Sequence, residues 1–388
     1  MLGAAIFLFL VVPYYWSWET IYNRNFSTYE RLLTQGRVLC LYLWQMLVPM
    51  PSNMPFYYDW LQPSHGLLQP WTTLAALVLL ALLLGTAWQL RHRRPLFALG
   101  VFLFFAGHFI TSNVVNLELA FEHRNHLPLI GIALAIGDVL ALLASRVHAR
   151  TPIVVAVFLL SLGGLASATL IRATSWNSDL HLAETSTRIA PNSTRAWNQL
   201  CVAYFNLGGG DRKENSYLDQ AIAACDKGAV VGTDSIKTLT NIVAMKAIQG
   251  TLTEADWARY LARLRTVTMT PENGSSIWII LNQARDGKPM NANHLLEAIE
   301  IVSQRRQVKP IESAAMGYFI LGHTPQPDKA YSYFARAVHD AKDPAFITGI
   351  IDELRKEGQP EWADKLTAEV RASGRDDVPL ATDGDHMP

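Results

Sequence analysis

Apolar residues dominate the first 173 positions in long runs, whereas residues 174–375 alternate apolar and polar positions at helical spacing. A run of about 17–25 mainly apolar residues is long enough to cross a bilayer as a helix. We therefore predict a membrane domain over residues 1–173. We expect its spans near residues 1–16, 71–90, 95–111, 127–145 and 152–171.

The first apolar run begins at Met1 and has neither the basic start nor the cleavage site of a secretory signal. We expect a membrane helix there, one whose beginning lies ahead of this chain. A further run, Val38–Pro49, is apolar over only about twelve residues and is too short to cross. Tyr42 and Trp44 suit headgroup depth, so we expect an interfacial helix at 38–49.

Basic residues predict how these spans are oriented. The short segments 91–94 and 146–150 are rich in Arg, and such loops stay on the cytoplasmic side. The segment 112–126 then faces the other side, and so does everything after residue 171. We therefore predict an inner (cytoplasmic) membrane protein with a periplasmic C-terminal domain and membrane lipids as partners.

The C-terminal half predicts an all-α array of helix pairs. Its clearest unit has the order small, aromatic, glycine, A-x3-F-x2-A and proline, which is the pattern of a tetratricopeptide repeat. These positions are Ala314, Ala315, Tyr318, Gly322, Ala330, Phe334, Ala337 and Pro344. A looser copy covers residues 191–228. We expect an α-solenoid of tetratricopeptide-like (TPR-like) helix pairs over 174–375. The polar stretch 376–388 predicts a disordered tail.

Charge and cysteine content narrow the picture. The chain has 33 Lys and Arg against 33 Asp and Glu, which gives no reason to expect a nucleic-acid partner. Cys201 and Cys225 fall on consecutive predicted helices. An oxidising compartment permits a disulfide between them, and two small buried residues in a helix interface fit equally well.

Candidate chemistry gathers at residues 122–126, Glu-His-Arg-Asn-His, beside a predicted span. One interpretation is an interfacial cap in which Arg124 and the histidines meet lipid phosphates. The other is a site for a phosphate or pyrophosphate headgroup, since this sequence offers an acceptor, a titratable group and an anion clamp. A helical approach would put Glu118 and Glu122 on one face. His108, near the end of a span, would face the protein interior.

Three segments together resemble the membrane glycosyltransferases of the GT-C type. They are residues 36–52, residues 117–131 and the repeat array after the last span. The chain is most similar to the transmembrane-and-tetratricopeptide O-mannosyltransferases and their bacterial relatives. The family signature falls on Glu122, His123, Arg124, Leu127, Pro128 and Gly131.

The resemblance implies a lipid-linked sugar donor and an acceptor protein or peptide bound by the array. Its donor-phosphate site corresponds to His123, Arg124 and His108. The supporting residues are Glu118, Glu122, Asn125 and His126. The family's catalytic acids lie in an early loop, where this chain has only the isolated Glu19, Glu30 and Asp59. We therefore assign no catalytic residue, metal ligand or cofactor to this chain, and expect a divalent metal only in a complete enzyme.

Other classes of function stay open. A non-catalytic, membrane-anchored TPR scaffold needs no donor site, because such arrays bind partner proteins. An enzyme like the O-antigen ligases or oligosaccharyltransferases would need a larger loop than residues 113–126. A channel or transporter would depend on Asp138, the one acid inside a predicted span.

Overall fold

The computed structural model describes residues 6–19, 25–146, 151–375 and 377–379, and the predictions for residues 1–5, 147–150 and most of the tail 376–388 lie outside them. Within the described residues, helices are the regular elements, and the backbone pairs otherwise only at an isolated bridge between Gly66 and Gln69. The all-α prediction is confirmed for this part of the chain. The chain forms two compact units: unit 1 is residues 1–210 with 215–232, and unit 2 is residues 211–214 with 233–388.

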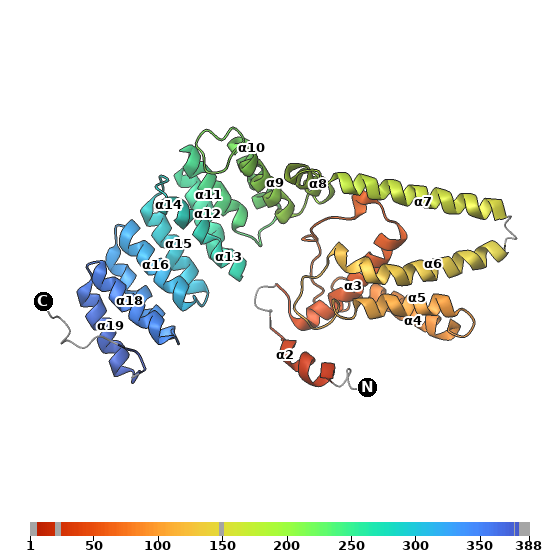
Figure 1. Cartoon of the computed structure of the whole chain (residues 1–388), viewed down its shortest axis with the longest axis horizontal. Helices are drawn as coiled ribbons and strands as arrows, with labels where there is room; N and C mark the ends of the chain where they lie inside the picture. The colour runs from red at the N-terminus through yellow and green to blue at the C-terminus, as the bar shows by residue number, and fades with distance from the viewer. Residues whose placement is uncertain (1–5, 20–24, 147–150, 376, 380–388) are drawn as a thin grey trace. The chain divides into compact units, whose positions relative to one another are not determined.

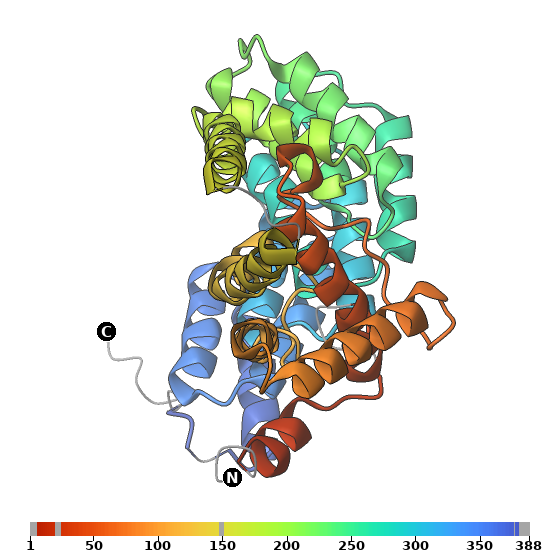
Figure 2. The ribbon, with the colours of Figure 1, turned by 90° about the vertical axis from the view of Figure 1, so that its right-hand side faces the viewer.

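In the described part of unit 1, three helices are long and apolar enough to cross a membrane (Figure 1). They are α4 (Thr72–Leu90), α6 (His126–Arg146, preceded by the 3₁₀ turn η3, Glu122–Asn125) and α7 (Thr151–Thr174). Figure 2 views α6 and α7 nearly end-on, so their axes run in similar directions. No residue of α7 is buried, and its apolar surface therefore requires lipid or another apolar partner.

The fourth apolar helix, α5 (Pro95–His108), is shorter than the span expected at 95–111. Its 14 residues extend about 21 Å, against about 30 Å for the hydrocarbon core of a bilayer. The helix ends at His108 because the following backbone turns toward the buried guanidinium of Arg31. This buried guanidinium donates hydrogen bonds to the carbonyl oxygens of Thr111 and Asn113 at 2.7 and 2.9 Å.

Two glycines bring α5 and α6 together. A Cβ atom on Gly131 would lie 2.9 Å from the backbone nitrogen of Phe104, and one on Gly100 would lie 2.7 Å from that of Ala135. Such close approach is the usual role of small residues between apolar helices. At the other end of this pair, Asp138 forms an ion pair with Arg94, with 2.9 Å between Oδ2 and Nε. The single acid of the apolar segments thus has a local structural partner.

The N-terminal part of unit 1 differs from the predicted elements. The helix α3 (Thr28–Leu47) is 20 residues long and so extends well before the predicted start at Val38. A capping box between Ser27 and Glu30 starts it, a signal that an apolar-run criterion does not detect. The described part of the predicted span at 1–16 is a π-helical turn, η1 (Phe7–Val11), followed by α2 (Val12–Tyr15).

Three amphipathic helices also belong to unit 1: α8 (Asp179–Ile189), α9 (Thr194–Leu207) and α10 (Leu218–Val231). The sequence boundary near residue 173 follows the change in hydropathy, whereas this compact unit continues to Gly232. A disulfide joins Cys201 on α9 to Cys225 on α10, which is one of the two arrangements that the sequence left open.

Unit 2 consists of successive helices that lie side by side in a row (Figure 1, teal to blue). The helices are α11 (Lys237–Gln249), α12 (Glu254–Thr266), α13 (Pro271–Ser275), α14 (Ile277–Arg285), α15 (Ala292–Arg305), α16 (Pro310–His323), α17 (Ala330–Asp340), α18 (Pro344–Lys356) and α19 (Pro360–Ala372). The contact between α16 and α17 uses Phe334, whose ring lies 4.8 Å from that of Tyr318 and against Gly317. Gly322, the glycine of the predicted repeat order, has open space beside it.

Candidate functional site

The segment between α5 and η3 wraps along α3 and is held by its side chains. Besides Thr111 and Asn113, Arg31 donates to the carbonyls of Leu117 and Glu118. Gln35 donates to the carbonyl of Leu119 at 3.0 Å. These bonds satisfy the carbonyl groups of a segment that forms no helix, and so they hold it along α3.

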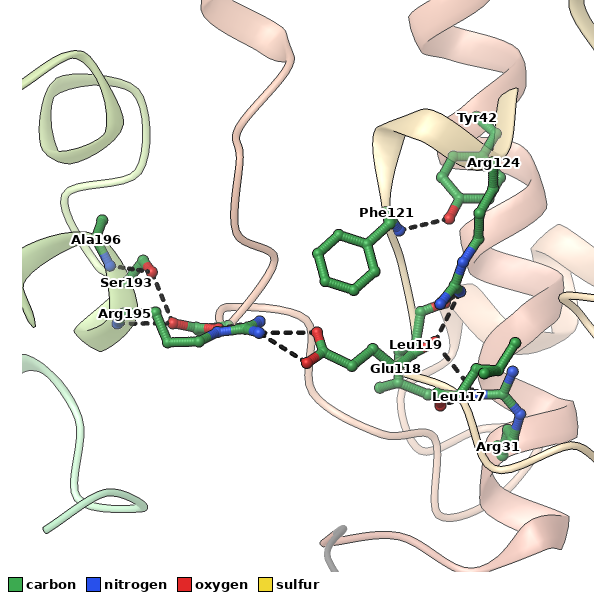
Figure 3. A network of polar contacts seen from close by, with 11 residues as sticks. Arg31, Tyr42, Leu117, Glu118, Leu119, Phe121, Arg124, Ser193, Arg195 and Ala196 are labelled. Atoms are coloured by element: carbon green, nitrogen blue, oxygen red, sulfur yellow. Dashed lines mark hydrogen bonds and ion pairs between the residues drawn. The ribbon is translucent and has the colours of Figure 1, made fainter. Parts of the chain in front are cut away.

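Tyr42 of α3 holds the end of the same segment. Its hydroxyl accepts a 2.8 Å hydrogen bond from the backbone nitrogen of Phe121, and its ring is fully buried (Figure 3). The chain then enters η3 and α6. The residues of the candidate site are thus positioned by α3, by the end of α5 and by the start of α6.

Glu118 and Glu122 do not share a helical face, contrary to the prediction. Glu118 lies in the irregular segment, and Glu122 begins the 3₁₀ turn. Glu118 pairs with Arg195 on α9, with 2.8 Å between Oε2 and Nη1. Glu122 pairs with Arg172 at the end of α7, with 2.6 Å between Oε2 and Nη2. Both acids are therefore engaged with arginines other than Arg124.

Arg124 binds main-chain oxygens. Its Nη1 donates to the carbonyls of Glu118 at 2.7 Å and Leu119 at 3.4 Å, and its guanidinium lies 5.4 Å from the centre of the Phe121 ring. Within the described residues it has no ion pair with a carboxylate. Its charge also acts on the nearby side chains of Tyr42 and His108. A half-buried guanidinium held in this way keeps a full positive charge that can attract an anion.

His108 is buried beside this cation. Its ring stacks on Tyr42 at a centroid distance of 5.0 Å and meets Phe104 edge-on at 4.8 Å. Neither ring nitrogen has a hydrogen-bond partner among the described residues, and the same holds for the buried amide oxygens of Asn125 and Gln45. Leaving such a group unsatisfied costs about 1–3 kcal/mol, so these atoms are candidates for contact with water or a ligand.

The other two predicted histidines lie at the surface. His123 is exposed and stacks on Phe121 at 5.2 Å. His126 is exposed too, and its Nδ1 lies 2.7 Å from the carbonyl oxygen of His123. The structure thus brings Arg124 and His108 together around Tyr42, and joins His123 to this group through the ring of Phe121.

The structure adds an acidic residue that sequence reasoning treated as isolated. Asp59 accepts hydrogen bonds from the Ser193 hydroxyl at 2.6 Å and from the backbone nitrogen of Arg195 at 3.1 Å. Arg195 also binds Asp59 through its side chain, and its Nη1 reaches both carboxylate oxygens of Glu118 at 2.8 and 2.9 Å (Figure 3). Burial lowers the pKa of Arg195, but the charges of Asp59 and Glu118 outweigh it and raise that pKa overall.

Two further contacts were absent from the prediction. The guanidinium of Arg172 lies 3.7 Å from the centre of the Phe56 ring, which helps to attach the end of α7. Glu30 binds His65 as well as Ser27. Partial burial of Glu30 raises its pKa, but the hydrogen bonds from Ser27 and His65 outweigh this and lower the pKa below its ordinary value. A sequence offers no signal for the Arg172–Phe56 and Glu30–His65 contacts, because the two partners of each lie far apart in the chain.

Among the described residues, no group of three His, Cys, Asp or Glu side chains is arranged to hold a metal ion. No protein-family model, curated protein or solved structure matches the chain.

Proposed function

We propose that this chain is part of a GT-C-type membrane glycosyltransferase and binds the phosphate of a polyprenyl-phosphate sugar on the outer face of the inner membrane. In this proposal the enzyme moves the sugar to a protein acceptor, and the TPR-like array of unit 2 binds that acceptor. Arg124, His108 and His123 bind the donor phosphate. Asn125 and Tyr42 line the same site.

The proposal is supported mainly by which arginines near η3 pair with a carboxylate and which do not. Arg195 is neutralised by Asp59 and Glu118, and Arg172 is paired with Glu122. Arg124 is held by carbonyl oxygens and so keeps its charge. An uncompensated guanidinium beside an apolar helix long enough to span a membrane suits an anionic headgroup with an apolar tail.

The same geometry supports a role in transfer. When the bond between the sugar's anomeric carbon and the phosphate oxygen breaks, negative charge increases on the departing polyprenyl phosphate. A fixed cation that is already positioned stabilises that charge without further reorganisation. Arg124 is positioned in this way, because Glu118 and Leu119 hold its Nη1 from one side and Phe121 lies under its guanidinium.

Two features support the remaining parts of the proposal. The disulfide between Cys201 and Cys225 fits an oxidising compartment, which favours a periplasmic location for α9 and α10. The paired helices of unit 2, with aromatic and small residues between α16 and α17, fit a solenoid that offers an extended surface to a polypeptide.

Binding of farnesyl monophosphate to the purified chain tests the proposal. The chain is placed in nanodiscs of zwitterionic lipid, and equilibrium binding is measured. Charge-assisted hydrogen bonds are worth about 1.5–3 kcal/mol, so Arg124→Ala should weaken binding by about 10–150-fold. Arg146→Ala is the matched control, because Arg146 lies at the opposite end of the same helix and is exposed.

Competition by lipids separates the donor from a bulk headgroup. Phosphatidylglycerol that displaces the probe at equal concentration would favour the interfacial cap. A wild-type chain without measurable binding would refute the donor site and favour the membrane-anchored scaffold.

A further inference from the structure

Arg195 lies where a helix of unit 1 meets the segment that carries the candidate site. It is the second residue of α9, and the side chain of Ser193 caps that helix while also binding Asp59. The guanidinium is shared between the carboxylates of Asp59 and Glu118 and lies 5.0 Å from the centre of the Tyr57 ring. Both carboxylate oxygens of Glu118 accept a hydrogen bond from Arg195 Nη1, so this contact is more specific than an ordinary surface ion pair.

Glu118 contacts two arginines through different groups. Its carboxylate binds Arg195, while its own carbonyl oxygen accepts a hydrogen bond from Arg124 at 2.7 Å (Figure 3). Only Cα, Cβ and Cγ separate that carbonyl from the carboxylate. A Glu118 side chain released from Arg195 is therefore tethered next to Arg124, and attraction between opposite charges would draw it there.

We propose that Arg195 is a positioning residue that holds the Glu118 carboxylate away from Arg124 and so keeps the Arg124 guanidinium available for an anion. This inference rests on the proposed function for its ligand, a polyprenyl monophosphate. Without Arg195, Glu118 occupies the guanidinium and competes with the phosphate as an internal anion. With Arg195 in place, the acid is neutralised at a distance from the site.

A double substitution distinguishes this role from a purely structural one. Arg195→Ala should weaken the binding of farnesyl monophosphate by about tenfold. Glu118→Gln alone keeps the backbone carbonyl that holds Arg124, and it is measured in parallel so that the effect of removing the acid by itself is known. The combination of Arg195→Ala with Glu118→Gln should restore binding, since a neutral amide does not compete for the guanidinium. If the Arg195–Glu118 pair only stabilised the fold, substituting Glu118 as well would not restore binding.

The control is Arg188→Ala on the preceding helix, where the arginine is exposed and binds Thr185. Arg195→Gln serves as a second variant at the same position, and it is measured where Arg195→Ala does not yield folded protein. Equal weakening in the single Arg195 variant and in the double variant would overturn the inference, as would an Arg195 variant that binds like wild type.

Modification of Arg124 by phenylglyoxal provides a readout that needs no lipid ligand. Its rate, followed by peptide mass spectrometry on the whole chain, should fall in Arg195→Ala and recover in the double variant. A rate that stays constant in all variants contradicts the inference. If the modification rates follow the expected order while no variant binds farnesyl monophosphate, the charge arrangement is supported and the proposed donor is refuted.

Discussion

The crossing of α5 and α6 provides the sharpest test of how the fold positions the candidate site. In Gly131→Ala, the added Cβ would meet the backbone oxygen of Gly100 most closely, and it would lie 2.9 Å from the backbone nitrogen of Phe104. Ordinary contacts of this kind begin at 3.4 Å, so the two helices must separate by at least about 0.5 Å. Because the contacted atoms belong to a helix backbone, local side-chain movement cannot relieve the clash.

Overpacking of this kind costs about 1–3 kcal/mol, which corresponds to a few degrees of thermal stability. Gly137→Ala is the matched control on the same helix. Space beside Gly137 is open, and Ala is a better helix former than Gly by up to about 1 kcal/mol. We expect Gly131→Ala to melt at a lower temperature in detergent than wild type, and Gly137→Ala to melt at the same or a higher temperature.

Gly131→Ala should also change the geometry of the candidate site. Phe104 lies one helical turn before His108, and Arg124 belongs to η3, which immediately precedes α6. Separation of the helices therefore moves the imidazole away from the guanidinium, and the binding of farnesyl monophosphate should weaken. If Gly131→Ala proves as stable as Gly137→Ala, the close packing of these two helices is not a real constraint on the molecule.

Three further predictions concern other parts of the chain. Replacing Cys201 and Cys225 with Ser opens a loop of 24 residues and should destabilise unit 1 by about 3 kcal/mol, measured by thermal unfolding; a wild-type melting temperature that does not respond to reductant would contradict this. The pKa of Glu30 is lower in the folded chain than its ordinary value of 4.5, so its stabilising contribution is present above that value and is lost as the pH falls through the folded pKa. Glu30→Gln should therefore reduce the loss of stability in acid, and an unchanged pH profile of the melting temperature would count against the Ser27 and His65 contacts. Phe334→Ala removes a fully buried ring between α16 and α17 and should cost about 3–5 kcal/mol, more than Phe346→Ala at a half-buried position, by chemical denaturation of the chain.

The helical part of the prediction succeeded where the pattern is local. The runs around α4, α6 and α7 are continuous in sequence, so their length and hydropathy could be determined directly. The end of α5 could not be found in this way, because it depends on Arg31, which lies 80 residues earlier in the chain than Thr111. The extent of α3 was missed for a different reason: its first half is polar, and only the Ser27 capping box marks its start.

At the candidate site, too, the sequence predicts local features but not contacts between distant residues. The sequence could indicate that Arg124 and its neighbours carry anion-binding chemistry, because the residue types alone have that capacity. It could not indicate which arginine keeps its charge. Asp59 and Arg195 are 136 residues apart, and Glu122 and Arg172 are 50 apart, so the pairings depend on how separate loops meet.

The availability of Arg124 is therefore a property of the whole network and not of the Glu-His-Arg-Asn-His stretch. Local spacing favours pairing Arg124 with Glu122 or Glu118, its nearest acids in sequence, and such pairing would neutralise the site. The fold avoids this by giving each acid a competing arginine from a later helix, Arg172 on α7 and Arg195 on α9. A variant that removes either competing arginine should weaken anion binding, although neither arginine forms a hydrogen bond or ion pair with Arg124 among the described residues. Because Glu122 is anchored at the start of η3 and Glu118 shares its carbonyl with Arg124, the effect should be larger for Arg195 than for Arg172.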